Sequence, residues 1–207
     1  VEITGDTRFD RVLSIKEKAQ ALPLIEKFVN HKNTFVAGSS WTPDEEIFIE
    51  YFNQHPQWKL IIAPHVVNKE HISAIRNKVK GRVVLYSEIN KGDIETADCL
   101  IIDCYGLLAS IYQYGDITYV GGGFGAGIHN VLEAAVWNVP VIFGPNNHNF
   151  MEARNLIAIG GGFEINNYDD FDNLLNRFSS SQECLKQAGE QAGHFVETCT
   201  GATCRIL

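Results

Sequence analysis

Short apolar runs alternate with helical patterns along the whole chain, and this alternation limits the possible folds more than any other feature. The runs are rich in β-branched and aromatic residues and mostly lack a period of two, which is typical of strands covered on both faces. Repeated strand–helix units predict an α/β domain with a doubly wound parallel sheet. The expected strands are Phe35–Ala37, Leu60–Ala63, Val83–Tyr86, Leu100–Asp103, Ile117–Val120, Val139–Phe143 and Phe163–Ile165.

Helical patterns lie between these runs. Thr42-Pro43-Asp44-Glu45 has the spacing of a capping box with proline at the first helical position, so we expect a helix to begin there. Asp170-Phe171-Asp172 is expected to open a helix rather than to bind a metal ion. The other expected helices are Pro23–Asn30, Lys69–Lys78, Leu107–Tyr114, His129–Trp137, Phe150–Ile159, Phe171–Phe178 and Gln182–Thr198.

The composition fits one domain with a full core. The chain has 207 residues, 45% of them hydrophobic, and a mean hydropathy of −0.08. No apolar run approaches the ~20 residues of a membrane span. The net charge is −8 and no Lys/Arg cluster occurs, which argues against nucleic acid as a partner. The five cysteines form no C-x-x-C motif, so we expect reduced thiols in a cytosolic setting.

A single domain is expected over residues 1–207, and its two ends are unusual. The opening "VEITGDTRFD" resembles a connection that leaves another segment, so residues 1–10 are expected to link two domains. Residues 182–207 are expected to form a closing helix, although "GATCRIL" carries no helix stop signal. Both ends indicate a piece of a longer protein.

Doubly wound sheets bind ligands beyond the carboxyl ends of their strands, so the residues that follow each expected strand are candidates for a site. The richest of these segments follows Ile117–Val120, where five glycines fall between Gly121 and Gly127. Glycines let a backbone approach a phosphate closely, although a tight turn alone explains them equally well. The dinucleotide fingerprint is not met, because no acidic residue ends the next strand, and a Walker lysine is absent.

The segment after the glycines carries His129, Asn130 and Glu133. In a helix over His129–Trp137 these residues share one face near the N-terminus, at i, i+1 and i+4. A glutamate one turn inside such a helix can accept two hydrogen bonds from a ribose diol. The alternative is that Asn130 caps the helix and Glu133 complements its dipole.

The stretch "VGGGFGAGIHNVLEAAVWNVPVIFGPNNHNFMEARNLI" resembles the donor-binding signature of the 3-deoxy-D-manno-octulosonic acid (Kdo) transferases, which build the inner core of lipopolysaccharide. Other stretches agree with that family in order along the chain. They are "GDTRFD", "AGSSWTPDEE", "LIIAPH", "DCYGLLASIYQYGDITYVGGG" and "FVETCTGATCRIL".

The resemblance implies the C-terminal half of a GT-B glycosyltransferase, a Rossmann-like domain that binds the donor CMP-Kdo without a metal or another cofactor. The N-terminal half would carry the membrane association, the site for a lipid A precursor and the catalytic carboxylate. This chain is therefore expected to bind nucleotide without turnover. The full-length enzyme would work at the cytoplasmic face of the bacterial inner membrane.

Some residues depart from the family pattern. Pro64-His65 stands where the family has Pro-Arg-His, so His65 or Arg154 would replace the arginine, and Phe124 stands where a serine is usual. Glu152 either assists at the ribose or sits in the first turn of its helix. The residues expected to bind CMP-Kdo are Ser39, Ser40, Pro64, His65, Ser87, Asp103, Gly122, Gly123, Gly127, His129, Asn130, Glu133 and Glu152.

Two other functions fit the residues less specifically. A UDP-GlcNAc epimerase or a UDP-dependent transferase also places a glutamate on a helix after a glycine loop. A non-enzymatic α/β binding module with a glycine-rich turn would bind no nucleotide at all.

Overall fold

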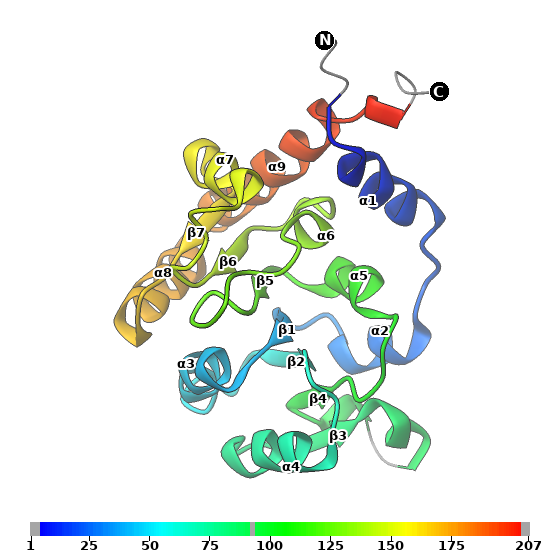
Figure 1. Cartoon of the computed structure of the whole chain (residues 1–207). Coiled ribbons are helices and arrows are strands. Elements are labelled where there is room, and N and C mark those ends of the chain that lie inside the picture. The colour runs from blue at the N-terminus through cyan, green and yellow to red at the C-terminus, as the bar shows by residue number, and fades with distance from the viewer. Residues whose placement is uncertain (1–4, 92–93, 204–207) are drawn as a thin grey trace.

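Seven parallel strands form one sheet at the centre of the molecule (Figure 1). The computed structural model describes residues 5–91 and 94–203. The strand order is β3-β4-β2-β1-β5-β6-β7, and all seven expected strands are confirmed. Their bounds are β1 Thr34–Ser40, β2 Lys59–Pro64, β3 Val83–Leu85, β4 Cys99–Ile101, β5 Ile117–Val120, β6 Val141–Phe143 and β7 Gly162–Glu164.

Helices cover both faces of this sheet, as the doubly wound prediction requires (Figure 1). Along β1, Val36 packs into one core with Phe28 of α2, whereas Phe35 and Ala37 pack into the other with Phe48 of α3. The central strand β1 is thus buried on both faces, which explains its continuous apolar run. The helices are α1 Thr7–Lys18, α2 Pro23–Val29, α3 Thr42–Phe52, α4 Lys69–Lys78, α5 Leu108–Ile111, α6 Leu132–Ala135, α7 Met151–Ile159, α8 Tyr168–Ser180 and α9 Gln182–Thr198, with 3-10 turns η1 Tyr86–Lys91, η2 Ile94–Thr96 and η3 Tyr112–Tyr114.

The ends of the chain differ from the expectation. Helix α1 was not expected, and it begins within the segment 1–10 that the sequence predicts as a connection; residues 1–4 lie outside the described residues. Phe9 and Val12 of α1 are buried, and Asp6 caps the helix through the Arg8 N–H at 2.9 Å. The expected closing helix over 182–207 ends at Thr198 of α9, and residues 204–207 lie outside the described part. Asp10 accepts hydrogen bonds from Gly201 N and Thr203 N, which joins α1 to the segment after α9.

The helix expected over His129–Trp137 is much shorter than predicted. The His129 N–H donates to Gly121 O at 3.1 Å instead of joining a helix, and Asn130 Oδ1 accepts from Leu132 N at 3.1 Å. His129 and Asn130 therefore belong to a loop, and α6 spans only Leu132–Ala135. The prediction that His129, Asn130 and Glu133 share one helix face is wrong, and a helix of one turn has little dipole to offer a ligand.

The strand order places the switch point of the sheet between β1 and β5. Strands β2, β3 and β4 lie on one side of β1, and strands β6 and β7 lie on the far side of β5. The loops that follow β1 and β5 therefore diverge at the carboxyl edge of the sheet. The end of β1 is irregular: its register shifts between Gly38 and Ser40, and Ser39 has a φ of 51°. A non-glycine residue in this left-handed region is strained, and such strain concentrates at functional sites.

Candidate functional site

A cavity of about 320 Å³ opens at the switch point, between the start of α3 and the glycine loop that follows β5. Its walls are largely apolar, with aromatic rings on both sides and loop backbone between them. Both the sequence expectation and the topology put a ligand at this edge of the sheet. The cavity is lined by Trp41, Pro43, Asp44, Gly122, Phe124, Gly125, Ala126, Gly127 and His129.

The buried carboxylate of Asp44 connects the two sides of this cavity. It accepts hydrogen bonds from the Tyr119 hydroxyl at 2.7 Å, from Gly122 N at 3.0 Å and from Trp41 N at 2.8 Å. Burial, and then the charge of Asp44, raise the pKa of Tyr119, so its hydroxyl stays a donor. The sequence identified Asp44 only as part of a capping box. The helix in fact has Trp41 at its N-cap, one residue earlier than predicted.

Two glycines of the loop, Gly122 and Gly123, are needed for packing within the protein. Gly122 has a φ of 95°, and a Cβ there would lie 2.4 Å from Gly127 O. A Cβ on Gly123 would lie 2.6 Å from the backbone of Gly144, which follows β6. The bare backbone is therefore no evidence of a phosphate by itself, because the loop could not close with larger residues.

The N–H groups of the loop divide into two sets. Those of Gly125 and Gly127 donate to Gly122 O, and that of His129 donates to Gly121 O, so these groups are used within the loop. The remaining N–H groups have no acceptor within residues 5–91 and 94–203. They are those of Gly123, Phe124, Ala126 and Ile128.

Of the two serines expected at the end of β1, Ser40 is committed to the protein interior. Its Oγ donates to Glu45 Oε1 at 2.9 Å, and Glu45 Oε2 lies 2.9 Å from His71 Nε2 of α4. Ser40 is fully buried, so it cannot reach a ligand directly. Ser39 is half-buried in its strained conformation and is the serine that remains available.

Pro64 and His65 end β2 beside β1. Pro64 is buried, and the His65 N–H donates to Ser40 O at 2.9 Å. The His65 ring stacks on Trp41, with centroids 4.6 Å apart, and on His129, with centroids 4.3 Å apart. Burial, and then the neighbouring His65, lower the pKa of His129. The structure thus brings the two predicted histidines together, and it adds a tryptophan that the sequence analysis missed.

Asn130 and Glu133 lie at the start of α6. Asn130 caps the turn through Leu132 N, as the alternative interpretation held, and its Nδ2 also donates to Glu133 Oε1 at 3.1 Å. Glu133 is half-buried, and its Oε2 meets no donor within the described ranges. Tyr112 lies close by, and its pKa is raised by burial and then by the charge of Glu133.

Four other predicted residues are bound elsewhere. Ser87 donates through N and Oγ to the Asp103 carboxylate, at 2.9 and 2.5 Å, which ties the ends of β3 and β4. Glu152 of α7 is 8% exposed and forms an ion pair with Arg8 of α1 at 2.7 Å. Glu152 therefore lies in the first turn of its helix, which was the second of the two expectations for it. Arg154 lies 3.9 Å from Glu164.

No group of three or more metal-ligating side chains occurs in the part of the chain that the structure describes. Asp170 of the expected helix opening lies in the first turn of α8, where it accepts from Asn166 N at 2.8 Å. None of the helices within the described ranges has the length and apolarity of a bilayer-spanning segment.

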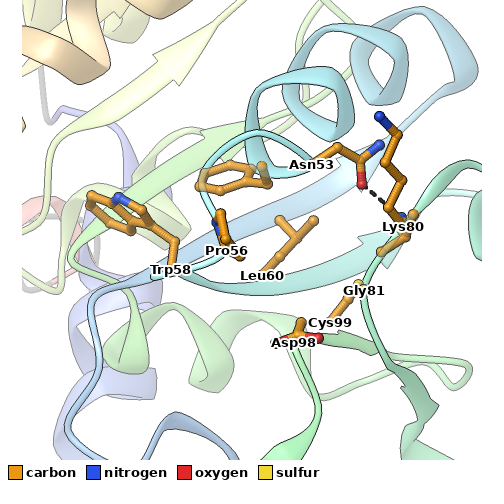
Figure 2. Close-up of a pocket in the computed structure, with 10 residues that line it drawn as sticks. Asn53, Pro56, Trp58, Leu60, Lys80, Gly81, Asp98 and Cys99 are labelled. Atoms are coloured by element: carbon orange, nitrogen blue, oxygen red, sulfur yellow. Dashed lines mark hydrogen bonds between the residues drawn. The ribbon is translucent and has the colours of Figure 1, made fainter.

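A second, smaller hollow of about 180 Å³ lies at the opposite edge of the sheet, where β2 and β4 begin (Figure 2). Phe52, Trp58 and Leu60 give it an apolar floor. Its polar groups are satisfied locally, since Asn53 Oδ1 accepts from Lys80 N at 2.7 Å and Asp98 accepts from Arg82 N at 2.8 Å. Amino edges of parallel sheets do not hold ligands in doubly wound folds.

No protein-family model matches the chain. A 3-deoxy-D-manno-octulosonic acid transferase of Aquifex aeolicus is 29% identical over 178 residues, which cover 83% of this chain and 47% of that protein. The transferase of Haemophilus influenzae is 24% identical over 216 residues, covering 100% of this chain and 50% of that protein. The chain is a relative of the Kdo transferases. It spans about half the length of the Kdo transferases that it matches.

Solved structures agree on the fold. The C-terminal CMP-Kdo binding domain of WaaA from Acinetobacter baumannii superposes with a TM-score of 0.71 at 19% identity, covering 91% of this chain and 97% of that one. Anabaena HepE, solved with UDP-glucose, gives a TM-score of 0.62 at 12% identity, covering 92% of this chain and 52% of that one. The sheet therefore has the architecture of a GT-B C-terminal domain.

Proposed function

We propose that this Kdo transferase relative is the donor-binding domain of a glycosyltransferase that moves Kdo from CMP-Kdo to a lipid A precursor in lipopolysaccharide synthesis. Sequence similarity to proteins named Kdo transferases supports the reaction. The acceptor site, the catalytic base and the contact with the inner membrane, at its cytoplasmic face, belong to the other half of the full-length protein. The donor binds at the cavity between Trp41 and the glycine loop.

One observation carries this proposal. Glu133 stands half-buried in the turn of helix that follows the glycine loop, next to but not in the lining of the cavity, with Oε1 fixed by Asn130 and Oε2 without a partner in the described part of the chain. A carboxylate held in this way is a preorganised acceptor for the hydroxyls of a ribose. Tyr112, whose raised pKa keeps its hydroxyl protonated, borders the same place.

The loop and the stacked histidines supply the anion site. In the transfer, the bond between the anomeric carbon and the CMP phosphate breaks, and negative charge grows on the departing phosphate. The N–H groups of Gly123, Phe124, Ala126 and Ile128 are preorganised donors for that charge, because they already stand unpaired in the folded protein. The strained Ser39 and the ring of His129 complete the site on the β1 side.

Titration of CMP and UMP against the chain tests the proposal. We expect CMP to bind with a Kd of about 1 mM, because the other half of the cleft is missing, and UMP to bind more weakly. Glu133→Ala should weaken CMP binding about tenfold, the effect of roughly 1.4 kcal/mol. Asn130→Ala should weaken it as well, because Glu133 then loses its fixed position. Glu190→Ala, at an exposed carboxylate of α9, is the matched control and should leave the affinity unchanged.

The likeness to HepE, which was solved with UDP-glucose, supports a second candidate function, that of a UDP-sugar enzyme. UMP binding tighter than CMP would support that candidate and contradict the Kdo donor. Binding of neither nucleotide at 10 mM, about ten times the expected Kd, would contradict both and favour a non-enzymatic module.

A further inference from the structure

Three aromatic rings from three different loops meet beside the cavity. Trp41 stands at the N-cap of α3, His65 follows β2, and His129 precedes α6. The His65 ring stacks on both others, with interplanar angles of 26° to Trp41 and 21° to His129. The indole Nε1 of Trp41 lies 3.2 Å from Nε2 of His129, so a hydrogen bond joins these two rings at their edges. Trp41 and His129 both line the cavity.

The chemistry of this hydrogen bond determines where the His129 ring carries its proton. An indole N–H is a donor and never an acceptor, so Nε2 of His129 must offer its lone pair. Nε2 is therefore unprotonated, and the proton of the neutral ring sits on Nδ1. Nδ1 meets no acceptor within residues 5–91 and 94–203, which leaves its N–H available to a ligand in the cavity.

Burial, and then the neighbouring His65, favour the neutral form of His129, while the Asp44 charge favours the protonated form. His65 faces it from the loop after β2, Asp44 faces it from α3, and Glu133 lies on its own segment. Burial and the neighbouring His65 lower the pKa of His129, and the Asp44 charge opposes this only weakly because three donors already hold that carboxylate. At neutral pH His129 thus has one N–H, and its position decides what the ring can bind.

We propose that Trp41 is a positioning residue that holds neutral His129 in the Nδ1–H tautomer, so that this N–H donates to an anionic oxygen of the bound donor, a phosphate or a sugar carboxylate. The inference rests on the proposed function for the identity of the ligand. The tautomer itself is a property of the protein without ligand. The role of Trp41 is indirect, because the group that touches the anion is His129.

The tautomer can be read by NMR of the chain labelled with ¹⁵N-histidine, without nucleotide. We expect the Nδ1–H tautomer for His129. His55, whose Nδ1 faces Tyr51 O at 2.8 Å, provides a reference for that tautomer in the same spectrum. In Trp41→Phe a ring still covers His65 but the donor is gone, so His129 should shift toward Nε2–H. Trp137→Phe removes an indole N–H that donates to Ala109 O and should leave His129 unchanged.

Titration of CMP then separates positioning from folding. For the wild-type chain we expect the same affinity at pH 6.5 and pH 8. Trp41→Phe should bind CMP about fivefold more weakly at pH 8, the loss of one hydrogen bond of about 1 kcal/mol. It should partly recover at pH 5.5, because a protonated ring donates from both nitrogens. Recovery with acid would not follow from a merely structural defect.

The possible failures are distinguishable. An Nε2–H ring in the wild-type chain, or an unchanged tautomer in Trp41→Phe, overturns the inference whatever the nucleotides do. A shifted tautomer with unchanged CMP affinity overturns the positioning role. If CMP does not bind the wild-type chain at all, the proposed function fails, and the ligand part of this inference fails with it. The tautomers of the wild-type chain and of Trp41→Phe still decide whether Trp41 fixes the position of the proton on His129. The wild-type spectrum alone settles which nitrogen of His129 carries the proton, and an Nε2–H ring there overturns the inference even if a variant does not fold.

Discussion

The two edges of the sheet are built in different ways. At the carboxyl edge, loops that are distant in sequence bond to one another through Asp44, through His65 N to Ser40 O and through the ring stack. Ser39, a non-glycine residue with a φ of 51°, lies there, whereas Asn30, His31 and Asn138, which also have positive φ, lie in the segments that lead into β1 and β6. At the amino edge, cross-loop bonds also occur, since Thr34 N donates to Asp116 Oδ2 at 2.7 Å and the Lys59 ammonium donates to Glu95 O at 2.8 Å. None of the ten residues that the structure places around the hollow of Figure 2 has a positive φ.

The buried Asp44 carboxylate and the ring stack beside a cavity support the carboxyl edge as the binding edge. Strain and buried polar bonds cost stability unless the surrounding structure compensates for them, and they persist where function requires a particular shape. The amino edge is packed as an ordinary apolar surface, with Cys99 in it so buried that its pKa is raised. A hollow by itself is therefore a weaker sign of function than strained backbone joined by cross-loop bonds.

The strongest test of this comparison removes one polar group from each edge. Asp44→Ala leaves the Tyr119 hydroxyl and the Gly122 N–H buried without an acceptor, so we expect a loss on the order of 3 kcal/mol in the free energy of unfolding. Asn53→Ala at the amino edge should cost about 1 kcal/mol, since water can reach the half-exposed backbone it bonds. Urea unfolding of both variants measures the difference. Equal losses would remove the distinction between the edges.

Backbone strain gives the next largest effect. Gly122→Ala combines a φ of 95° with a Cβ at 2.4 Å from Gly127 O, so we expect a loss of about 2 kcal/mol or more. Gly125→Ala is the matched control in the same loop. Its Cβ would meet only Gly122 O at 3.6 Å, and its stability should stay equal or rise by up to about 1 kcal/mol. Thermal unfolding compares the two, and a tolerant Gly122 would contradict the packing explanation.

The pH dependence of stability should also separate the edges. Because the folded state lowers the pKa of His129, the unfolded chain binds its proton more readily. This contribution is therefore favourable above the ordinary histidine pKa of about 6.5 and is lost as the pH falls below it. Burial also lowers the pKa of Lys59 at the amino edge, but from an ordinary lysine value of about 10.4 rather than from one near neutrality. His129→Gln should therefore lose stability less steeply than the wild type between pH 7 and pH 5, as urea unfolding would show. Parallel curves would be the contrary result.

The smallest effect is expected at Glu152, which we place outside the part of the carboxyl edge that binds the donor. Glu152 already accepts from Arg8, so Glu152→Gln should change CMP affinity less than about twofold and stability by less than about 1 kcal/mol. Glu133→Gln, by contrast, should weaken CMP clearly by calorimetry. If the two variants weaken CMP equally, Glu152 leaves Arg8 on binding and joins the ribose site.

The sequence predicted the strands well because their signal is local. Each strand is covered on both faces, and its apolar run ends at turn residues, so all seven were found. Helix α1 was missed because its pattern is weak: Phe9 and Val12 are its only fully buried residues, in a mostly charged segment. The helix expected from His129 was too long because His129 N bonds to Gly121 O, a contact that no periodicity reveals.

The sequence predicted where the candidate site residues lie better than it predicted what each of them bonds to. Residues after strands do meet at one edge, but their partners depend on tertiary contacts such as Ser87 with Asp103 and Glu152 with Arg8. Asp44 was missed as a site residue because a capping box explained it completely, and Trp41, directly before that box, was given no role. The available signal was their place directly after a central strand, where a helix N-terminus faces the switch point.

The three donors that converge on Asp44 have a consequence for how fast a ligand can bind. One carboxylate fastens the start of α3, the end of β5 and the glycine loop before any ligand arrives. The freedom of these loops is therefore already lost on folding, so an incoming nucleotide has only its own motion to give up. We expect association without a slow closing step in the isolated domain, at rates governed by encounter and orientation.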